Sequence, residues 1–144
     1  MSGSTSLLYI GNIAISWGLL ILIWLVQTII YPGLSRIPSK DFVNYHRWYV
    51  TRISTIVLPL MICEVIATIG WLMLEPDSQY STLAAFMLVI VWLSTFMLQV
   101  PIHRHLQSGK DLARIGRLVN TNWIRTIAWT VKSFIVTISA VNRI

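Results

Sequence analysis

Four long apolar stretches, separated by short polar connections, constrain the fold of this chain more than any other feature. They cover residues 7–31, 52–74, 81–103 and 117–141. A helix needs about 20 predominantly apolar residues to cross the hydrocarbon core of a bilayer, and each stretch reaches that length. We therefore expect an all-α integral membrane protein, a four-transmembrane-helix bundle with an amphipathic extension before the second helix. The predicted helices cover residues 7–31, 40–74, 81–106 and 112–141.

Little of the chain lies outside these stretches. The sequence has 144 residues, of which 56% are hydrophobic, so we expect one transmembrane domain over residues 1–144 and no soluble catalytic domain within it. Cys63 is the only cysteine, which rules out an internal disulfide and a cysteine cluster for zinc or iron–sulfur. The net charge of +6 is attributed to topology signals and lipid headgroup contacts, and no nucleic acid partner is expected.

The basic residues predict an orientation in the membrane. The first connection contains Arg36, Lys40, Arg47 and Arg52, and the third contains Arg104, Lys110, Arg114 and Arg117. The second connection has no Lys or Arg and contains Glu75 and Asp77 instead, and Arg143 alone follows the fourth helix. Because short cytoplasmic loops are enriched in Lys and Arg, the first and third connections are expected in the cytoplasm. Both termini would then lie outside a multi-pass protein of the inner (cytoplasmic) membrane.

Proline and glycine residues indicate where helices end or loosen. Pro32 and Gly33 are expected to end the first helix at Tyr31. Ser39 is expected to cap the second helix, with Asp41 in its first turn. That helix should continue unbroken from the amphipathic segment into the membrane, and Pro101 should unwind part of the third helix.

The fourth stretch carries a polar stripe at helical spacing. Its members are Leu118, Asn122, Arg125, Trp129, Lys132 and Val136. They fall on one helical face, and charged groups in hydrocarbon are costly unless they face a partner or a wet cavity. The stripe should therefore face the interior of the bundle. Glu64 is the only acidic residue inside the other apolar stretches, and we expect it to pair with Arg125, while Lys132 would extend toward the outer surface.

Polar residues concentrate in the cytoplasmic half of the predicted bundle, which indicates a polar pocket opening inward. Aromatic walls with a few convergent polar groups are typical of a small-molecule site, and a hydrophobic aromatic or quinone-like ligand is expected. Arg125 and Asn122 would polarise a carbonyl of the ligand, and His103 or Glu64 would move a proton. Further contacts to the ligand or cofactor would come from Gln99, Trp92, Trp129 and His46. Gln27 and Tyr31 either pack between helices or line the mouth of the pocket.

A metal site is an alternative use of the two histidines. His46 and His103 are suitable ligands for iron, copper or zinc, and as a facing pair they could ligate haem. Glu64 is the only intramembrane carboxylate, too few for a di-iron bundle. No cofactor is strongly indicated, and haem, iron and copper stay open. His105 is about 200° from His103 around the helix and is not expected to share its site.

Several segments together resemble a known family. The histidine-bearing segment before the second helix, the sequence "QVPIHRHL" and the Trp- and Arg-rich "NWIRTIAW" resemble the small four-helix membrane proteins related to anthrone oxygenase. The resemblance implies oxidation of a polycyclic aromatic molecule. It also implies that His103, Asn122 and Arg125 are positions of functional interest.

Two functions of other classes stay open. The chain could be a non-catalytic accessory subunit that packs on partner helices of a larger membrane complex or forms a homo-oligomer. It could also be a proton- or ion-conducting oligomer with a path past Glu64. Whether the chain is an enzyme is left undecided by the sequence.

Overall fold

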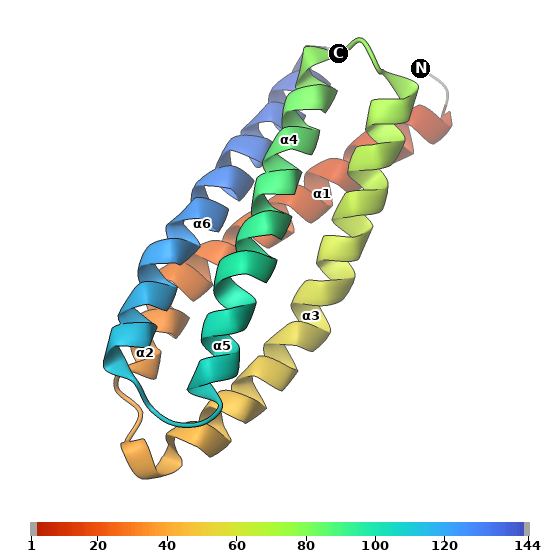
Figure 1. Cartoon of the computed structure of the whole chain (residues 1–144). Coiled ribbons are helices and arrows are strands. Elements are labelled where there is room, and N and C mark those ends of the chain that lie inside the picture. The colour runs from red at the N-terminus through yellow and green to blue at the C-terminus, as the bar shows by residue number, and fades with distance from the viewer. Residues whose placement is uncertain (1–2, 143–144) are drawn as a thin grey trace.

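The protein consists of four long helical segments that run side by side (Figure 1). The computed structural model describes residues 3–142, with side chains from Leu7 onward, so Arg143 and the chain ends lie outside the described residues. The first and third segments are each made of three pieces, α1 (Gly3–Leu25), η1 (Val26–Ile30) and α2 (Tyr31–Leu34), then α4 (Gln79–Ser94), η2 (Thr95–Gln99) and α5 (Val100–Leu106). The second and fourth segments are the single helices α3 (Ser39–Leu74) and α6 (Leu112–Val141).

The all-helical, four-helix prediction is confirmed for the described residues, which contain no strand. All four segments are long and apolar enough to span a membrane. Many large apolar side chains on the outside of the bundle are exposed, among them Ile21, Ile66, Met73 and Met97. A soluble domain would not expose so much apolar surface on every helix.

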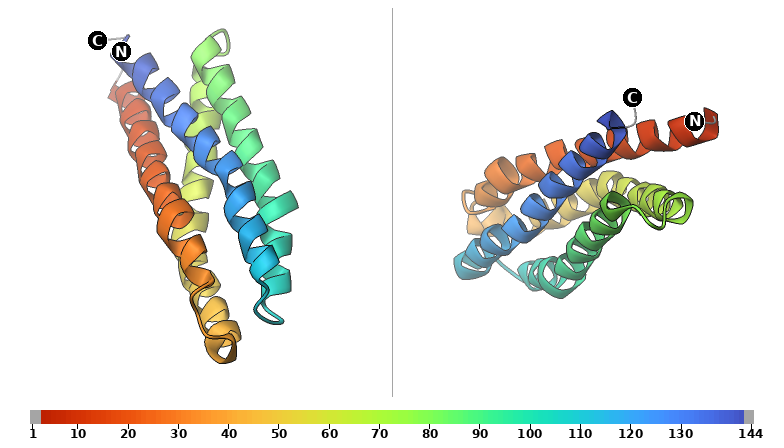
Figure 2. Two further views of the ribbon diagram at one scale, coloured as in Figure 1. Left: turned by 90° about the vertical axis from the view of Figure 1, so that its left-hand side faces the viewer. Right: turned by 90° about the horizontal axis from the view of Figure 1, so that it is seen from above.

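Helix α6 holds the bundle together. It packs closely against α1 and α4, while α3 packs against α1 and α4 from the other side (Figure 2). The connections at residues 35–38 and 107–111 lie at the same end of the bundle, and residues 75–78 connect α3 to α4 at the opposite end (Figure 1). The end that contains residues 35–38 and 107–111 is called the basic end below, because most of the Lys and Arg residues lie near it.

The first helix does not end at Tyr31 as expected. It continues through Pro32 and Gly33 to Leu34, after a π-helical turn in which the Tyr31 N–H donates to the Val26 carbonyl. Proline removes only one backbone donor, and the wider turn before it accommodates the ring without stopping the helix. The same arrangement precedes Pro101, where η2 provides the local unwinding expected there.

The starts of α3 and α6 differ from each other. Helix α3 is unbroken over 36 residues, as expected, with Asp41 in its first turn. Ser39 is its first helical residue and does not cap it, because Pro38 occupies the N-cap position and makes no side-chain cap. Helix α6 is capped by Asp111, whose Oδ1 accepts from the Arg114 N–H at 3.0 Å.

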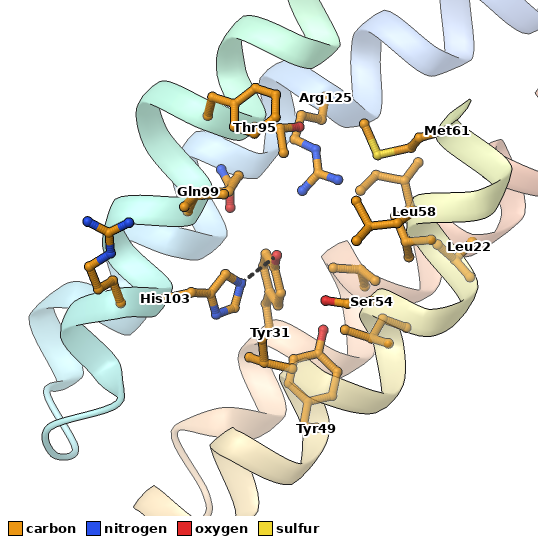
Figure 3. A pocket seen from close by; sticks show the side chains of 18 of the residues that line it. Leu22, Tyr31, Tyr49, Ser54, Leu58, Met61, Thr95, Gln99, His103 and Arg125 are labelled. Atoms are coloured by element: carbon orange, nitrogen blue, oxygen red, sulfur yellow. Dashed lines mark hydrogen bonds between the residues drawn. The ribbon is translucent and has the colours of Figure 1, made fainter. Parts of the chain in front are cut away.

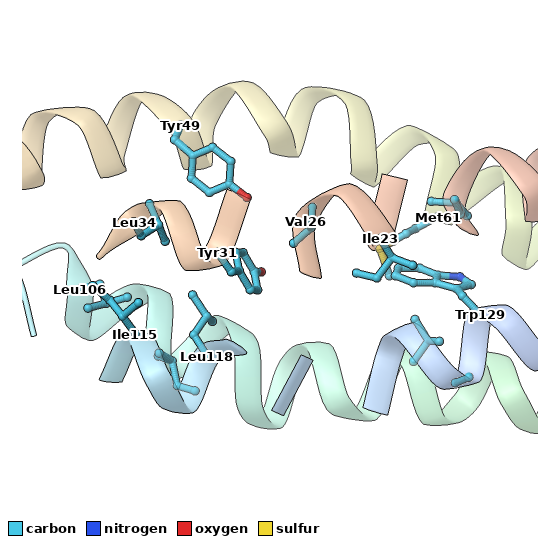
Figure 4. Close-up of a cluster of buried hydrophobic side chains, with 14 of the residues drawn as sticks. Ile23, Val26, Tyr31, Leu34, Tyr49, Met61, Leu106, Ile115, Leu118 and Trp129 are labelled. Atoms are coloured by element: carbon cyan, nitrogen blue, oxygen red, sulfur yellow. The ribbon is translucent and has the colours of Figure 1, made fainter. Parts of the chain in front are cut away.

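The stripe on α6 faces the interior, as predicted. Leu118, Asn122, Trp129, Lys132 and Val136 are fully buried, and Arg125 is 7% exposed. The largest apolar cluster surrounds this stripe and runs from Leu34, Leu106 and Ile115 at the basic end to Ile23, Met61 and Trp129 near the middle (Figure 4). The interior of the bundle therefore combines an apolar core with a row of buried polar groups.

Candidate functional site

A cavity of about 480 Å³ lies in the half of the bundle nearer the basic end. It is enclosed by the first segment, α3, the η2–α5 part of the third segment and one residue of α6 (Figure 3). Its apolar wall includes Leu22, Ile23, Val26, Val57, Leu58 and Met61. Its polar residues are Tyr31, Tyr49, Ser54, Thr95, Gln99, His103, Arg104, Gln107 and Arg125. The volume and the mixture of an apolar wall with a few polar groups match those of small-molecule sites.

Arg125 points into this cavity from α6 (Figure 3). Its guanidinium donates to Asn122 Oδ1 at 3.3 Å and lies 5.0 Å from the centre of the Trp129 ring. The Arg125 Nε is buried and has no hydrogen-bond partner. A planar guanidinium held by an amide and an aromatic face, with donors still free, is suited to bind an oxygen of a ligand.

His103, Tyr31 and His46 form a hydrogen-bonded chain beside the cavity. His103 Nε2 lies 3.0 Å from the Tyr31 hydroxyl, and His103 Nδ1 lies 3.0 Å from His46 Nε2. The two imidazole rings are stacked with centroids 5.2 Å apart, and Phe42 stacks on the buried His46. Which nitrogens carry protons depends on the tautomers, and either direction of donation makes a continuous chain. Because the His46 Nδ1 is buried without a partner, the chain ends there.

Gln27 anchors α6 behind the cavity. Its Oε1 accepts hydrogen bonds from Asn122 Nδ2 at 2.9 Å and Thr126 Oγ1 at 3.2 Å, and its Nε2 donates to the Val119 carbonyl at 3.1 Å. Asn122 itself does not line the cavity, contrary to the expectation that it polarises a carbonyl of the ligand. It links Gln27 to Arg125 and orients the guanidinium.

Gln99 belongs to the cavity wall, as the sequence indicated. Its Nε2 donates to Thr121 Oγ1 at 3.0 Å, whereas its Oε1 is buried and has no partner. An unpartnered buried acceptor is costly, so this oxygen is available to a donor group of a ligand. It is the last residue of the π-helical turn η2, and such turns are frequent at functional sites.

Glu64 pairs with Lys132 and not with Arg125, contrary to the expectation from the sequence. Its Oε1 lies 3.0 Å from Lys132 Nζ, and both side chains are fully buried. Lys132 also donates to Ser16 Oγ at 3.0 Å and to Asn12 Oδ1 at 3.5 Å, so it does not extend to the surface. Helix α1 stabilises this arrangement, because it places the side chains of Asn12 and Ser16 against the Lys132 ammonium.

The two tryptophans expected at the site lie elsewhere. Trp129 is buried between Arg125 and Glu64, and its Nε1 donates to Glu64 Oε2 at 2.9 Å. Trp92 lines a separate apolar groove between α3 and α4. The aromatic side chains of the cavity wall are Tyr31, Tyr49 and Phe96.

Two cavity residues, Ser54 and Met61, were not identified from the sequence. With Val50 and Val57 they are spaced 4, 3 and 4 residues apart, and all four line the cavity. That spacing marks one face of α3 and could have revealed them. His105 is exposed and does not share the site of His103, as expected.

His46 and His103 do not fit a metal or haem in this arrangement. Their facing nitrogens are hydrogen-bonded to each other, and an ion between them at about 2 Å from each nitrogen would require the rings to move apart. Within residues 3–142 no group of three His, Cys, Asp or Glu side chains is placed to hold a metal ion.

Comparison with known proteins does not identify the chain. No family model, no curated protein and no solved structure matches it. The function is therefore inferred from the geometry of the cavity and from the sequence.

Proposed function

We propose that this chain is a multi-pass protein of the inner membrane that binds a hydrophobic aromatic or quinone-like molecule in the cavity near its basic end. The observation that carries the proposal is the cavity itself, with its apolar wall and the polar groups of Tyr31, Gln99, His103 and Arg125. The four apolar segments support the location in a membrane. The Lys and Arg residues support a basic end in the cytoplasm and termini outside.

The roles of the polar groups follow from their positions. Arg125 donates to a carbonyl or phenolic oxygen of the ligand, and Asn122 positions Arg125. Gln99 Oε1 accepts from a hydroxyl of the ligand. His103 lines the cavity and takes up a proton that can pass to His46, whereas Glu64 is held in its ion pair away from the cavity.

The chemistry that fits these groups is oxidation of the bound aromatic molecule. In the reaction that the resemblance to the anthrone oxygenase relatives suggests, a CH₂ between two aryl rings becomes a carbonyl. Dioxygen is the oxidant: one oxygen atom enters the product, and the other leaves as water with the two hydrogens. Arg125 would stabilise the negative charge that develops on the ring oxygen when His103 removes a proton.

Binding is tested with the full chain purified in detergent. Quenching of tryptophan fluorescence is measured during titration with 2-methyl-1,4-naphthoquinone. Arg125→Met should abolish saturable quenching and leave the helical circular dichroism spectrum unchanged. Arg117→Met, at an exposed arginine on the same helix, is the matched control and should bind normally. Unchanged binding by Arg125→Met would show that the ligand does not use this cavity.

Turnover is tested separately. Oxygen uptake with anthrone should exceed the spontaneous rate in the presence of the protein, and His103→Ala should remove the excess. If the ligand binds and no excess uptake occurs, the chain is a binding protein rather than an oxidase.

A second candidate is an accessory subunit of a larger membrane complex. It is favoured by the groove between α3 and α4, whose wall contains Val65, Ile69, Leu72, Val89 and Trp92 and is almost entirely apolar. A subunit should co-purify with a stoichiometric partner in mild detergent and lose stability without it.

A further inference from the structure

Arg125 is a buried cation without a counter-ion in the described part of the chain. Its side chain is 7% exposed, and its contacts are an amide oxygen and an aromatic face. The guanidinium also faces the hydroxyl of Tyr31 (Figure 3). All of these groups are neutral, and arginine does not lose its proton in proteins.

The acidic residues of the chain are all engaged or distant. Glu64 is the only acidic residue inside the bundle, and it forms an ion pair with Lys132. Asp111 pairs with Arg114 at the basic end, and Glu75 interacts with Tyr9 and Trp71 at the opposite end. Asp41 and Asp77 are exposed near the helix ends. Within residues 3–142 no carboxylate forms an ion pair with Arg125.

An uncompensated charge at membrane depth is unfavourable, and it is usually matched by a partner or by water in a cavity. The cavity in front of the guanidinium is where such a partner can bind. Of the groups a ligand can bring, an anion compensates the charge most completely, because a neutral ligand supplies only a hydrogen-bond acceptor.

The cavity also indicates how the ligand reaches Arg125. Among the residues that line it, Leu58, Phe96 and Val100 are exposed on the side of the bundle, between α3 and η2–α5. Arg104 and Gln107 are exposed at the end of the same opening nearest the basic end. An apolar rim with a cationic edge suits an amphiphile that comes from the membrane with its charged group toward the basic end.

We propose that the ligand is an acidic aromatic amphiphile whose ionised oxygen pairs with Arg125, and that it enters sideways from the membrane between α3 and η2–α5. The ionised oxygen is a carboxylate or an acidic ring hydroxyl. This inference rests on the proposed function and narrows its ligand class to molecules with a negative charge at their polar end.

The test compares matched probes on the full chain in detergent at pH 7.5. The first pair is 2-hydroxy-1,4-naphthoquinone, which is ionised at this pH, and its neutral 2-methoxy analogue. The second pair is hexadecanoic acid and hexadecanol. Dissociation constants are measured by tryptophan quenching for the quinones and directly, by isothermal titration calorimetry, for the aliphatic pair. We expect the hydroxyquinone to bind about tenfold or more tightly than the methoxy compound, as charge-assisted hydrogen bonds do over neutral ones.

Variants assign the preference to Arg125. Arg125→Gln should remove the preference for the acidic quinone, Arg125→Lys should retain part of it, and the exposed Arg117→Gln should leave it unchanged. If Arg125→Gln does not fold, Arg125→Lys and the wild-type comparison of the two quinones still decide the question.

The outcomes separate this inference from the proposed function. Equal binding of both quinones overturns the anionic ligand and leaves the aromatic site standing. Binding of hexadecanoic acid but of neither quinone keeps the anionic group and overturns the aromatic class. Binding of no probe overturns both.

Discussion

Lys132 Nζ lies 3.0 Å from Glu64 Oε1, and neither side chain has any exposed surface. The pair connects α6 to α3, and Ser16 and Asn12 of α1 complete the contacts of the lysine. Three helices are therefore joined at one buried polar point. Replacing one residue of a buried ion pair lowers the free energy of unfolding by more than the intact pair contributes. The reason is that the remaining charge is then buried without compensation.

The contribution of the Glu64–Lys132 pair and the cost of one unpaired buried charge can be measured separately. Glu64→Met and Lys132→Met should each destabilise the bundle by about 3–5 kcal/mol, since each leaves an unpaired buried charge. The double replacement should be much less destabilising than the sum. Thermal unfolding in detergent, followed by circular dichroism, measures all three. The exposed Lys40→Met is the control, and strictly additive effects would show that the two residues do not interact.

Trp129→Phe tests the second contact of Glu64. The phenylalanine ring retains most of the packing but removes the Nε1–H that donates to Glu64 Oε2. A loss of about 1–3 kcal/mol in unfolding free energy is expected from an unsatisfied charged acceptor. Trp123→Phe is the matched control, because that ring is 41% exposed and lies on the outer face of the same helix. Equal effects of the two substitutions would assign the loss to packing alone.

Gln27→Leu should affect both stability and ligand binding. It removes the acceptor of the buried Asn122 Nδ2 and should cost about 1–3 kcal/mol for that unpaired donor, whereas Thr126 Oγ1 can still donate to the Asn122 carbonyl at 3.1 Å. Because Asn122 orients Arg125, quinone affinity should also fall. The exposed neighbour Thr28→Val should change neither the unfolding temperature nor the dissociation constant. A stable Gln27→Leu with full affinity would contradict the positioning role.

Tyr31→Phe should weaken ligand binding without loss of the fold. It removes the hydroxyl that lies 3.0 Å from His103 Nε2, so the imidazole is held less firmly at the cavity. We expect quinone affinity to fall by about three- to tenfold, the usual effect of one neutral hydrogen bond. Tyr45→Phe, at a tyrosine that is 39% exposed, is the control. An unchanged dissociation constant would remove Tyr31 from the binding site.

Asp111 should make part of the stability depend on pH. The Arg114 backbone N–H donates to its carboxylate and lowers the pKa of that group below its usual value. Its contribution is therefore fully present above the unfolded pKa of about 3.9 and is lost as the pH falls through the lower folded value. Asp111→Asn keeps a cap acceptor but has no charge. The difference in unfolding temperature between the two proteins should be constant near neutral pH and disappear in acid; a difference that persists there would show that the charge is not involved.

The buried face of α6 could be predicted from the sequence because helical geometry is local. Asn122, Arg125 and Lys132 must share one face at their spacing, and charged groups at membrane depth must turn inward. The same reasoning gave the existence of the four helices, the continuity of α3 and a polar region near the basic end. The predicted end of the first helix at Tyr31 was wrong, because no simple local sequence pattern encodes the π-helical turn before Pro32.

The partners of the buried groups were decided by the tertiary structure. Spacing fixes the face and the approximate depth of a side chain, but not the neighbour it meets across the bundle. The packing of the four helices brings Glu64 to Lys132, places Arg125 at the cavity and places Trp92 in a different groove. His46 and His103, 57 residues apart, meet only because α3 and α5 converge at the basic end. The sequence by itself determined which face of the fourth helix points inward, because that face follows from helical periodicity and polarity. Only the packing of four helices decided which buried residues meet and which of them form the site.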